Sequence, residues 1–183
     1  MQFLLLAGSF HSRSYTHALL DIITDILAPH QCVRPALDHL PFYSEDLGGA
    51  NKPELVVAFL KQVQDSDGIV VCSPEYNHSI PAVLKNAIDW ASRPAFKSPL
   101  KDKPVTIITQ AHSPVGGARA QAHIKLVFDS TLSPIHPCHE MMITEVRDIF
   151  DAQMQLTDAK TRGRLERHIG DFLGWLPRPG NSV

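Results

Sequence analysis

The chain has 183 residues and a formal net charge of −2. This length suits one domain with a sizeable core, and a nearly balanced charge without a basic stripe argues against nucleic-acid binding. The apolar N-terminal stretch is too short to span a membrane, and three scattered cysteines fit a reducing compartment better than a disulfide framework. We therefore expect a single domain over residues 1–183, cytoplasmic, with neither a membrane nor a nucleic acid as partner.

Short apolar runs alternate with helical periods along the chain, which is typical of a parallel sheet flanked by helices. Residues 3–8 are predicted to form a strand buried on both faces, because apolar residues follow one another without alternation. A helix is expected from Ser14, where apolar residues recur at helical spacing. Residues 32–37 form a weaker second strand, and Pro35 favours an edge position for it.

The middle of the chain repeats this alternation. A loop over residues 40–53 leads to a helix that begins near Pro53. Residues 67–73 are predicted to form a buried central strand, since valines favour the pleated form. The next helix has an apolar stripe over residues 80–91, with Ser79 as its expected cap and a solvated polar face opposite the stripe.

The last third of the chain supplies the remaining elements. A fourth strand is expected over residues 103–110 and a helix over residues 117–128. A fifth strand lies within residues 132–143, and the final helix has an apolar face over residues 165–176. Residues 177–183 are expected to fray into solvent. Five strands with intervening helices predict one doubly wound α/β domain.

Three loops leave the carboxyl ends of predicted strands, the edge where open α/β sheets bind ligands. Their sequences are GSFHSRSYT after the first strand, PEYNHS after the third and AHSPVGG after the fourth. All three are rich in residues that turn tightly or form hydrogen bonds. Their convergence predicts one ligand site at this edge of the sheet.

The first of these loops has the features of a phosphate site. Serine hydroxyls and backbone amides precede a helix N-terminus, where the helix dipole contributes roughly half a positive charge. Neither a P-loop motif nor a GxGxxG motif occurs in the chain. Ordinary capping of the helix by Ser12 or Ser14 accounts for the serines equally well.

The second loop contains the tetrapeptide PEYN. Pro74 stiffens the exit from a buried strand, while Tyr76 and Asn77 combine a flat apolar surface with an amide. That combination suits the edge of a planar heterocycle. The alternative is a simple turn in which Asn77 or Ser79 caps the next helix.

These loops, with the stretches LPFYSEDL, SPEYNHSIPAVLKNAIDW and SPVGGARAQAHIKLVF, resemble the NADPH-dependent FMN reductase family from about Met1 to His139. The resemblance implies a flavodoxin-like three-layer sandwich, an α/β fold with a five-stranded parallel sheet in the order 2-1-3-4-5. It implies bound FMN and an NAD(P)H oxidoreductase, with NADPH or NADH as co-substrate. Hydride would pass through N5 of the flavin to small acceptors in a ping-pong reaction, the acceptors being quinones, azo or nitro compounds, metal oxyanions or free flavin.

Two other functions fit the same fold. The first is an FMN-binding electron carrier or redox sensor with little turnover. The nearly neutral charge counts against a carrier, which commonly docks through an acidic face. The second is an enzyme that takes a nucleotide or nucleoside as its substrate, because the fold alone does not decide the ligand.

The resemblance implies FMN-binding residues in all three loops and no catalytic side chain. They are Ser9, His11, Arg13, Ser14, Tyr15 and Thr16 in the first loop, Pro74, Glu75, Tyr76 and Asn77 in the second, and Gln110, Ser113, Gly116 and Gly117 in the third. The first group would hold the phosphate and the second the isoalloxazine, with the glycine pair closing the other side of the ring. The family usually has an arginine where His11 stands and an asparagine where Thr16 stands, and Arg13 is expected to supply the missing cation.

Other features of the sequence are expected to be structural. The stretch HPCHE, residues 136–140, contains zinc ligands, but neighbouring residues on a strand point to opposite faces, so Cys138 and His139 could not share an ion. No metal site is therefore expected. His78 and His112 are the titratable residues expected nearest the flavin. An ordinary loop histidine is the favoured interpretation, and proton transfer near neutral pH is the alternative. Cys72 is expected to be a packing residue.

The resemblance further implies a homodimer or homotetramer with an interface near the flavin. Trp90 is the expected anchor of that interface, because tryptophan is enriched among the residues that contribute most to binding.

Overall fold

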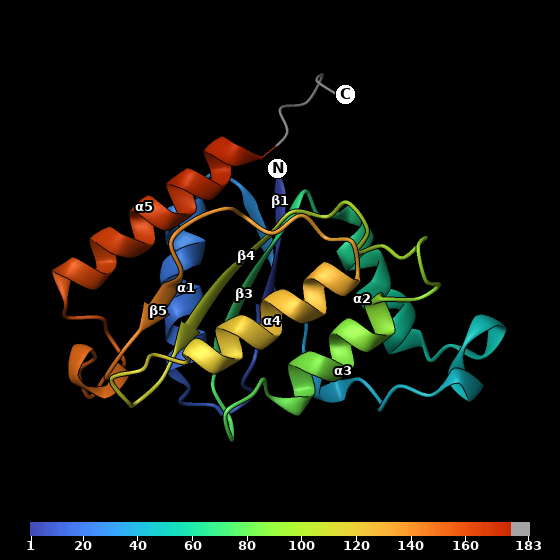
Figure 1. Cartoon of the computed structure of the whole chain (residues 1–183), viewed down its shortest axis with the longest axis horizontal. Helices are drawn as coiled ribbons and strands as arrows, with labels where there is room; N and C mark the ends of the chain where they lie inside the picture. The colour runs from blue at the N-terminus through green and yellow to red at the C-terminus, as the bar shows by residue number, and fades with distance from the viewer. Residues whose placement is uncertain (177–183) are drawn as a thin grey trace.

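Five parallel strands form one sheet in the order β2-β1-β3-β4-β5, with helices on both faces (Figure 1). The strands are β1 (Gln2–Ala7), β2 (Gln31–Val33), β3 (Gly68–Pro74), β4 (Val105–Gln110) and β5 (Met141–Ile143). The computed structural model describes residues 1–176, so the predicted fraying of residues 177–183 concerns a segment outside the described residues. The strand order and the parallel pairing confirm the predicted flavodoxin-like α/β fold.

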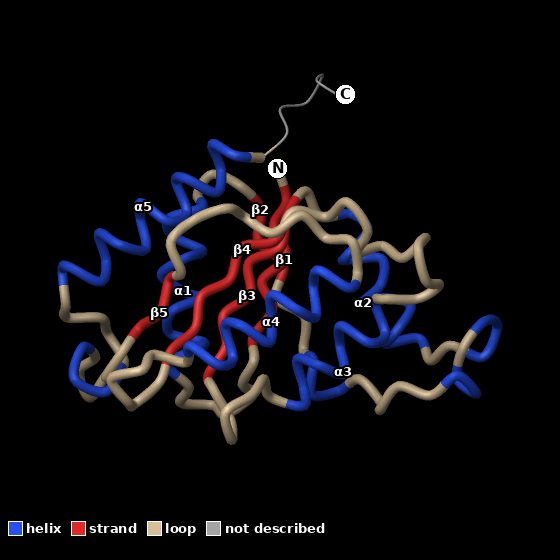
Figure 2. The backbone as a smooth tube through the Cα atoms, in the orientation of Figure 1, coloured by secondary structure: helices blue, strands red, loops and turns tan. Residues whose placement is uncertain are grey.

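Two layers of helices cover this sheet (Figure 2). The helices are α1 (Tyr15–Leu27), α2 (Glu54–Asp65), α3 (Ala82–Ala91), α4 (Ala118–Ser130) and α5 (Ala159–Trp175). Short 3₁₀ turns lie in the connections at η1 (Leu37–His39), η2 (Glu45–Leu47), η3 (Gly49–Asn51) and η4 (Val146–Ile149). Helices α1 and α5 pack on one face of the sheet, and α2, α3 and α4 pack on the other.

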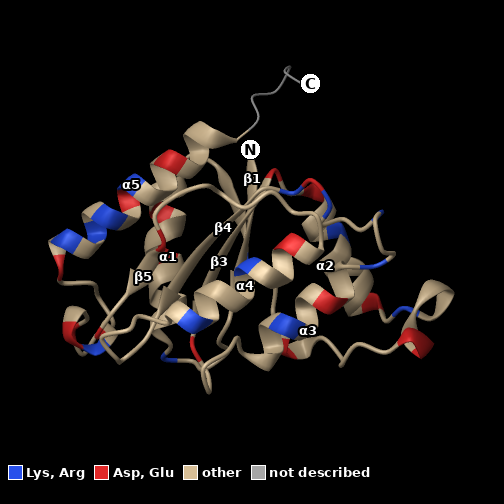
Figure 3. Cartoon of the chain, viewed as in Figure 1, with Lys and Arg blue, Asp and Glu red and all other residues tan. Residues whose placement is uncertain are grey.

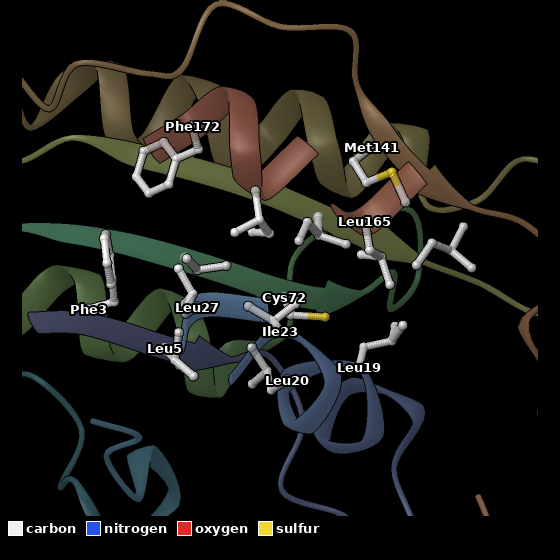
Figure 4. Close-up of a cluster of buried hydrophobic side chains, with 14 of the residues drawn as sticks. Phe3, Leu5, Leu19, Leu20, Ile23, Leu27, Cys72, Met141, Leu165 and Phe172 are labelled. Atoms are coloured by element: carbon white, nitrogen blue, oxygen red, sulfur yellow. The ribbon is translucent and has the colours of Figure 1, made fainter. Parts of the chain in front are cut away.

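The first strand shows why its sequence lacks alternation. Phe3 and Leu5 contact the cluster under α1 and α5, whereas Leu4 and Leu6 contact the cluster under α2, α3 and α4. Every side chain of β1 after Gln2 is buried, because a parallel sheet of this type is covered on both faces. Figure 4 shows the first of these clusters, in which Phe172 of α5 lies above the strands. Burying each such side chain contributes roughly 1.5–3 kcal/mol.

Both edge strands are short. Strand β2 has three residues and ends before Pro35, which agrees with the predicted edge position. Strand β5 also has three residues and forms the other edge. Across the outer faces of α3 and α4, positive and negative side chains are interspersed (Figure 3). Within residues 1–176, no helix has the length and apolar character needed to cross a membrane.

The start of α3 differs from the prediction. Pro81 occupies the N-cap position and no side chain caps the helix, so the expected cap by Ser79 is wrong. The Ser79 hydroxyl instead lies 3.0 Å from Nδ1 of His123 on α4. The reason is a tight turn immediately before the helix, which places Ser79 in a hairpin with Tyr76.

The polar face of α3 is not simply solvated. Asn86 is buried, and its side chain accepts from the amide of Tyr43 at 2.8 Å and donates to the carbonyl of Pro41 at 3.0 Å. Trp90 is 1% exposed and donates its indole N–H to the same Pro41 carbonyl at 2.7 Å. Trp90 therefore fixes the segment before η2 inside the protomer, and the expectation that it anchors an interface is wrong.

Candidate functional site

The carboxyl ends of all strands lie at one edge of the sheet, where the loops after β1, β3 and β4 come together (Figure 1). They surround a cavity of about 280 Å³. The cavity is lined by Ser9, His11, Arg13, Ser14, Tyr15, Pro74, Glu75, Tyr76, Gln110, Ala111 and His112. All of these except Ala111 and His112 are residues predicted from the sequence to bind the cofactor. The predicted residues Thr16, Asn77, Ser113, Gly116 and Gly117 do not line it.

A close approach between two strands sets the position of the first loop. The amide of Gly8 donates to the carbonyl of Cys72 at 2.8 Å, as the loop leaves β1 beside β3. A Cβ atom on Gly8 would lie 2.3 Å from Oγ of Ser73, so only glycine fits there. The first loop is thereby held against the end of β3.

The serines of the first loop form a donor-rich end of the cavity. Ser14 caps α1 by accepting from the amide of Thr16 at 3.1 Å, and Oγ of Ser9 accepts from the amide of His11 at 3.4 Å. Each hydroxyl keeps its own proton for donation to a ligand. The first turn of α1 contains no acidic residue. This end therefore suits an anion, and capping by Ser14 is compatible with that role.

Thr16 lies below the cavity and has a supporting role. It is fully buried, and its hydroxyl accepts from the side-chain amide of Gln110 at 3.4 Å. Gln110 ends β4 and does line the cavity. Thr16 therefore orients a lining residue from the neighbouring loop.

The cationic side chain of the first loop lies at its exposed rim. The guanidinium of Arg13 donates to the carbonyl of Ala152 at 2.9 Å, and its backbone amide donates to Nδ1 of His11 at 3.1 Å. Both side chains line the cavity. Arg13 thus places a positive charge at the anion end while it is tied to the segment after η4.

The PEYN stretch folds into a two-residue hairpin turn. Tyr76 and Ser79 exchange backbone hydrogen bonds of 3.0 and 2.9 Å. Asn77 and His78 between them have φ values of 49° and 66°, the left-handed region that a type I′ turn requires. Asparagine and histidine are among the residues most often found there. The turn raises Tyr76 to the cavity rim, where it is 50% exposed.

Glu75 joins the second loop to the third. Its carboxylate accepts from the backbone amides of Arg119 at 3.0 Å and Ala120 at 3.2 Å, in the first turn of α4. The N-cap residue of that helix is Gly117, which has no side chain to offer, so Glu75 caps the helix from another loop. Burial by itself raises the pKa of Glu75, but hydrogen bonds from Ala120, Arg119 and His78 outweigh it and hold the pKa below its ordinary value.

The glycine pair of the third loop has a structural place. Gly116 and Gly117 have φ values of 65° and 79° and pack against the ends of β4 and β5. The hydroxyl of Thr109 donates to the carbonyl of Gly116 at 3.0 Å, and the Ser113 hydroxyl accepts from the amide of Val115 at 3.4 Å. The glycines turn the chain into α4 and leave the cavity lining to residues 110–112.

Of the two histidines expected nearest the flavin, His112 lines the cavity and His78 does not. The ring of His112 packs edge-on against Tyr15 with centroids 5.6 Å apart. Burial, followed by the positive charge of Arg147, lowers its pKa below the ordinary value. A neutral imidazole thus lies beside the cavity near neutral pH. Its position, two residues after the end of β4, is what predicted it near the ligand site.

Cys72 lies under the site and takes no part in its chemistry. It is fully buried in β3, and burial raises the pKa of its thiol to about 12. The thiol is therefore protonated, which agrees with its expected packing role.

The lining residues fit an elongated ligand with an anionic end and a flat end. Donors gather at Ser9, Ser14 and the N-terminus of α1, and no carboxylate stands among residues 8–16. Tyr76 and Pro74 offer apolar surface at the other loop. FMN has a phosphate and a planar ring in this arrangement, so these residues fit that cofactor.

Comparisons with known proteins agree with this fit. The sequence model of the NADPH-dependent FMN reductase family matches residues 1–148. The chain is 35% identical over 178 residues to the NAD(P)H-dependent FMN reductase PA1204 of Pseudomonas aeruginosa, with 94% of each chain covered. It is 36% identical over 137 residues to the 2-hydroxy-1,4-benzoquinone reductase of a Burkholderia species, covering 75% of this chain and 74% of that protein. The solved structure of FerB, a flavoenzyme NAD(P)H:(acceptor) oxidoreductase from Paracoccus denitrificans, is similar with a TM-score of 0.87 at 29% identity, covering 96% of each chain.

Proposed function

Because the chain belongs to the NADPH-dependent FMN reductase family, as its motifs predicted, we propose that it oxidises NAD(P)H and reduces quinones with FMN held between the β1, β3 and β4 loops. One observation carries the placement of the cofactor. Three loops that are far apart in the sequence line a single cavity, and one end of that cavity is rich in hydrogen-bond donors.

The first loop would hold the phosphate of FMN. Hydroxyl donors from Ser9 and Ser14 and the amides at the start of α1 favour a dianion, and Arg13 adds a full charge at the rim. Such charge-assisted hydrogen bonds are about twice as strong as neutral ones. No metal ion is needed to neutralise the phosphate in this arrangement.

The second and third loops would hold the ring. Pro74 and Tyr76 supply apolar contact, while Gln110 and His112 supply hydrogen-bonding groups at its edge. The backbone amide of His112 has no partner within residues 1–176, so it remains available as a donor. Fixed donors of this kind stabilise negative charge without reorganisation.

Bound FMN supplies the chemistry, since the flavin accepts hydride from NAD(P)H and passes electrons to the acceptor. The chain contributes binding, orientation and fixed donors, and we assign no catalytic side chain. The cavity rim at Tyr76 is open to solvent, so a nicotinamide and a quinone can occupy the same face in turn. That exchange predicts ping-pong kinetics.

A spectroscopic experiment tests the proposal. The purified protein should show a flavin spectrum, NADPH or NADH should bleach it without oxygen, and a benzoquinone should restore it. Steady-state rates should then give parallel lines in double-reciprocal plots. A bound flavin that neither nucleotide reduces would identify an electron carrier. A protein that takes up no FMN would overturn the assignment of the cavity.

The predicted homodimer or homotetramer belongs to the same proposal. Phe42 is 81% exposed in the connection between β2 and α2, and Phe96 is 77% exposed in the connection after α3. Large apolar side chains exposed in this way commonly mark interaction surfaces. Light scattering should give the mass of two or four chains, and Phe42→Ser should shift that mass towards a single chain.

A further inference from the structure

The connection from α4 to β5 crosses the amino edge of the sheet, opposite the flavin site (Figure 1). Residues 136–140 in this connection form a loop, so the alternation of a strand does not govern where their side chains point. The amide of His136 donates to the carbonyl of Val105 at 2.8 Å, which fixes the loop at the start of β4.

Two elements bring three potential metal ligands together at this loop. One ring nitrogen of His136, one ring nitrogen of His168 from α5 and the sulfur of Cys138 lie within 4.8 Å of one another. Both histidines are 6% exposed, while Cys138 is exposed. Cys138 and His139 were not expected to share an ion, and the fold instead groups Cys138 with His136 and His168.

Both imidazole rings are held in place by the same side chain. Oγ1 of Thr106 lies 3.1 Å from Nδ1 of His136 and 2.8 Å from Nε2 of His168. A threonine hydroxyl can accept two hydrogen bonds, so it can serve both rings at once. Each ring keeps a second nitrogen, and metal-binding histidines in proteins are usually oriented by a hydrogen bond at the other nitrogen.

The cluster also has space beside it. It lies against a hollow of about 730 Å³ that is lined by Glu140, Asp171, Arg164 and Arg167, among others. The two acids balance the two arginines, so the hollow itself does not exclude a cation. A water molecule can reach a metal from this side.

We propose that His136, Cys138 and His168 bind one Zn²⁺ ion with water as the fourth ligand. Two imidazoles and a thiolate suit zinc, and ideal Zn–N and Zn–S bonds place tetrahedral ligands roughly 3.3–3.6 Å apart. The observed separations of up to 4.8 Å therefore require a small inward movement of the three side chains, of which Cys138 is exposed. Binding releases the proton of the Cys138 thiol to solvent.

The site is separate from the flavin. Thr106 precedes Gln110 by four residues on β4, which corresponds to about 13 Å along the strand. A zinc ion there would cross-link the α4–β5 connection to α5. It would stabilise the fold and take no part in electron transfer.

Metal titration of the tag-free, FMN-loaded protein tests this proposal. After treatment with a chelator, the protein should bind one Zn²⁺ per chain in calorimetry, and Zn²⁺ should raise its melting temperature. Cys138→Ser should weaken Zn²⁺ binding by at least about 100-fold, because losing a ligand exceeds the 10–100-fold effect of losing a supporting partner. Cobalt should produce visible bands beyond the flavin absorption in the original protein and lose its thiolate band in Cys138→Ser.

His139→Gln is the matched control, since His139 is adjacent to Cys138 and exposed but lies outside the cluster. Its Zn²⁺ affinity should equal that of the original protein. Absence of stoichiometric Zn²⁺ binding, or equal binding by the original protein and Cys138→Ser, would overturn the proposal. Neither result would bear on the flavin site.

Discussion

The two edges of the sheet use polar residues in opposite ways. At the carboxyl edge, Ser9, Ser14 and the amide of His112 leave donors beside a cavity. At the amino edge, the buried hydroxyl of Thr106 bonds to both His136 and His168. The first edge is organised by turns within single loops, and the second by contacts between distant elements.

This difference shows where function can be read from a sequence. A cavity built from consecutive turn residues keeps its motif together in the chain, as PEYN does. A cluster that combines a loop with a helix far along the chain leaves no such motif. The experiments below test whether the carboxyl edge depends on backbone geometry, on charge or on individual side chains, beginning with the largest expected effect.

Gly8→Ala should have the largest effect, because the added Cβ would lie 2.3 Å from the side chain of Ser73. Such overpacking costs about 1–3 kcal/mol of unfolding free energy and should displace the first loop. We expect a lower melting temperature and little bound FMN after purification. Gly170→Ala is the control, since no atom lies within 4 Å of its added Cβ, and it should stabilise α5 by about 0.5–1 kcal/mol. If Gly8→Ala keeps its full FMN content, the close approach of the backbone at Gly8 does not determine the position of the first loop.

The second-largest effect is expected from removing the positive charge of Arg13 at the rim of the cavity. Arg13→Ala should weaken FMN binding by about 10–100-fold, as expected for losing a hydrogen bond of about 1.5–3 kcal/mol to a charged phosphate. His11→Ala should weaken it by less than about tenfold, because the guanidinium of Arg13, with its permanent charge and five donors, is the stronger partner for a dianion. Titration of both flavin-free variants with FMN measures the order. The reverse order would show that Arg13 does not replace the usual arginine of the family.

Glu75→Ala should have an intermediate effect on stability. Removing the carboxylate leaves the amides of Arg119 and Ala120 without a cap, which costs about 0.5–2 kcal/mol. Chemical denaturation measures the loss. Glu54→Ala is the matched control, since Glu54 lies in the first turn of α2 and no side-chain cap is present there. Equal losses in the two variants would show that Glu75 does not cap α4.

The contribution of Glu75 to the free energy of unfolding should depend on pH in one direction. The pKa of Glu75 in the folded state is below its ordinary value of 4.5. Its contribution to stability is therefore complete above pH 4.5 and is lost as the pH falls through the folded pKa. The stability difference between the original protein and Glu75→Gln should shrink over that acidic range. A difference that grows on acidification would contradict the low pKa.

Asn77→Gly should have the smallest effect, and it separates a turn residue from a cofactor ligand. Glycine accepts the φ of 49° at this position, so the hairpin should persist with a stability change within about 0.5 kcal/mol. FMN affinity should then stay within about threefold of the original. Asn77→Val should be less stable, because a β-branched residue is strained at positive φ. If Asn77→Gly instead loses much of its FMN affinity, the side-chain amide of Asn77 binds the cofactor.

The sequence alone determined the fold and the edge of the sheet at which the cavity lies. Apolar runs without alternation predicted strands buried on both faces, and the loops after β1, β3 and β4 could be placed together because parallel strands end at the same edge. Local turn chemistry acts between neighbours in the chain, so its residues appear together in the sequence. That is why most of the cavity lining could be named in advance.

Only the tertiary structure decided how individual side chains are used. Glu75 caps α4 because Gly117, at the N-cap position, has no side chain with which to cap it. Trp90 faces inward because the carbonyl of Pro41 accepts its indole hydrogen bond. The grouping of Cys138 with His168 arises from the packing of α5 beside β4. Each of these outcomes depends on which distant groups come within hydrogen-bond or coordination distance, and that distance is fixed by packing rather than by spacing along the chain.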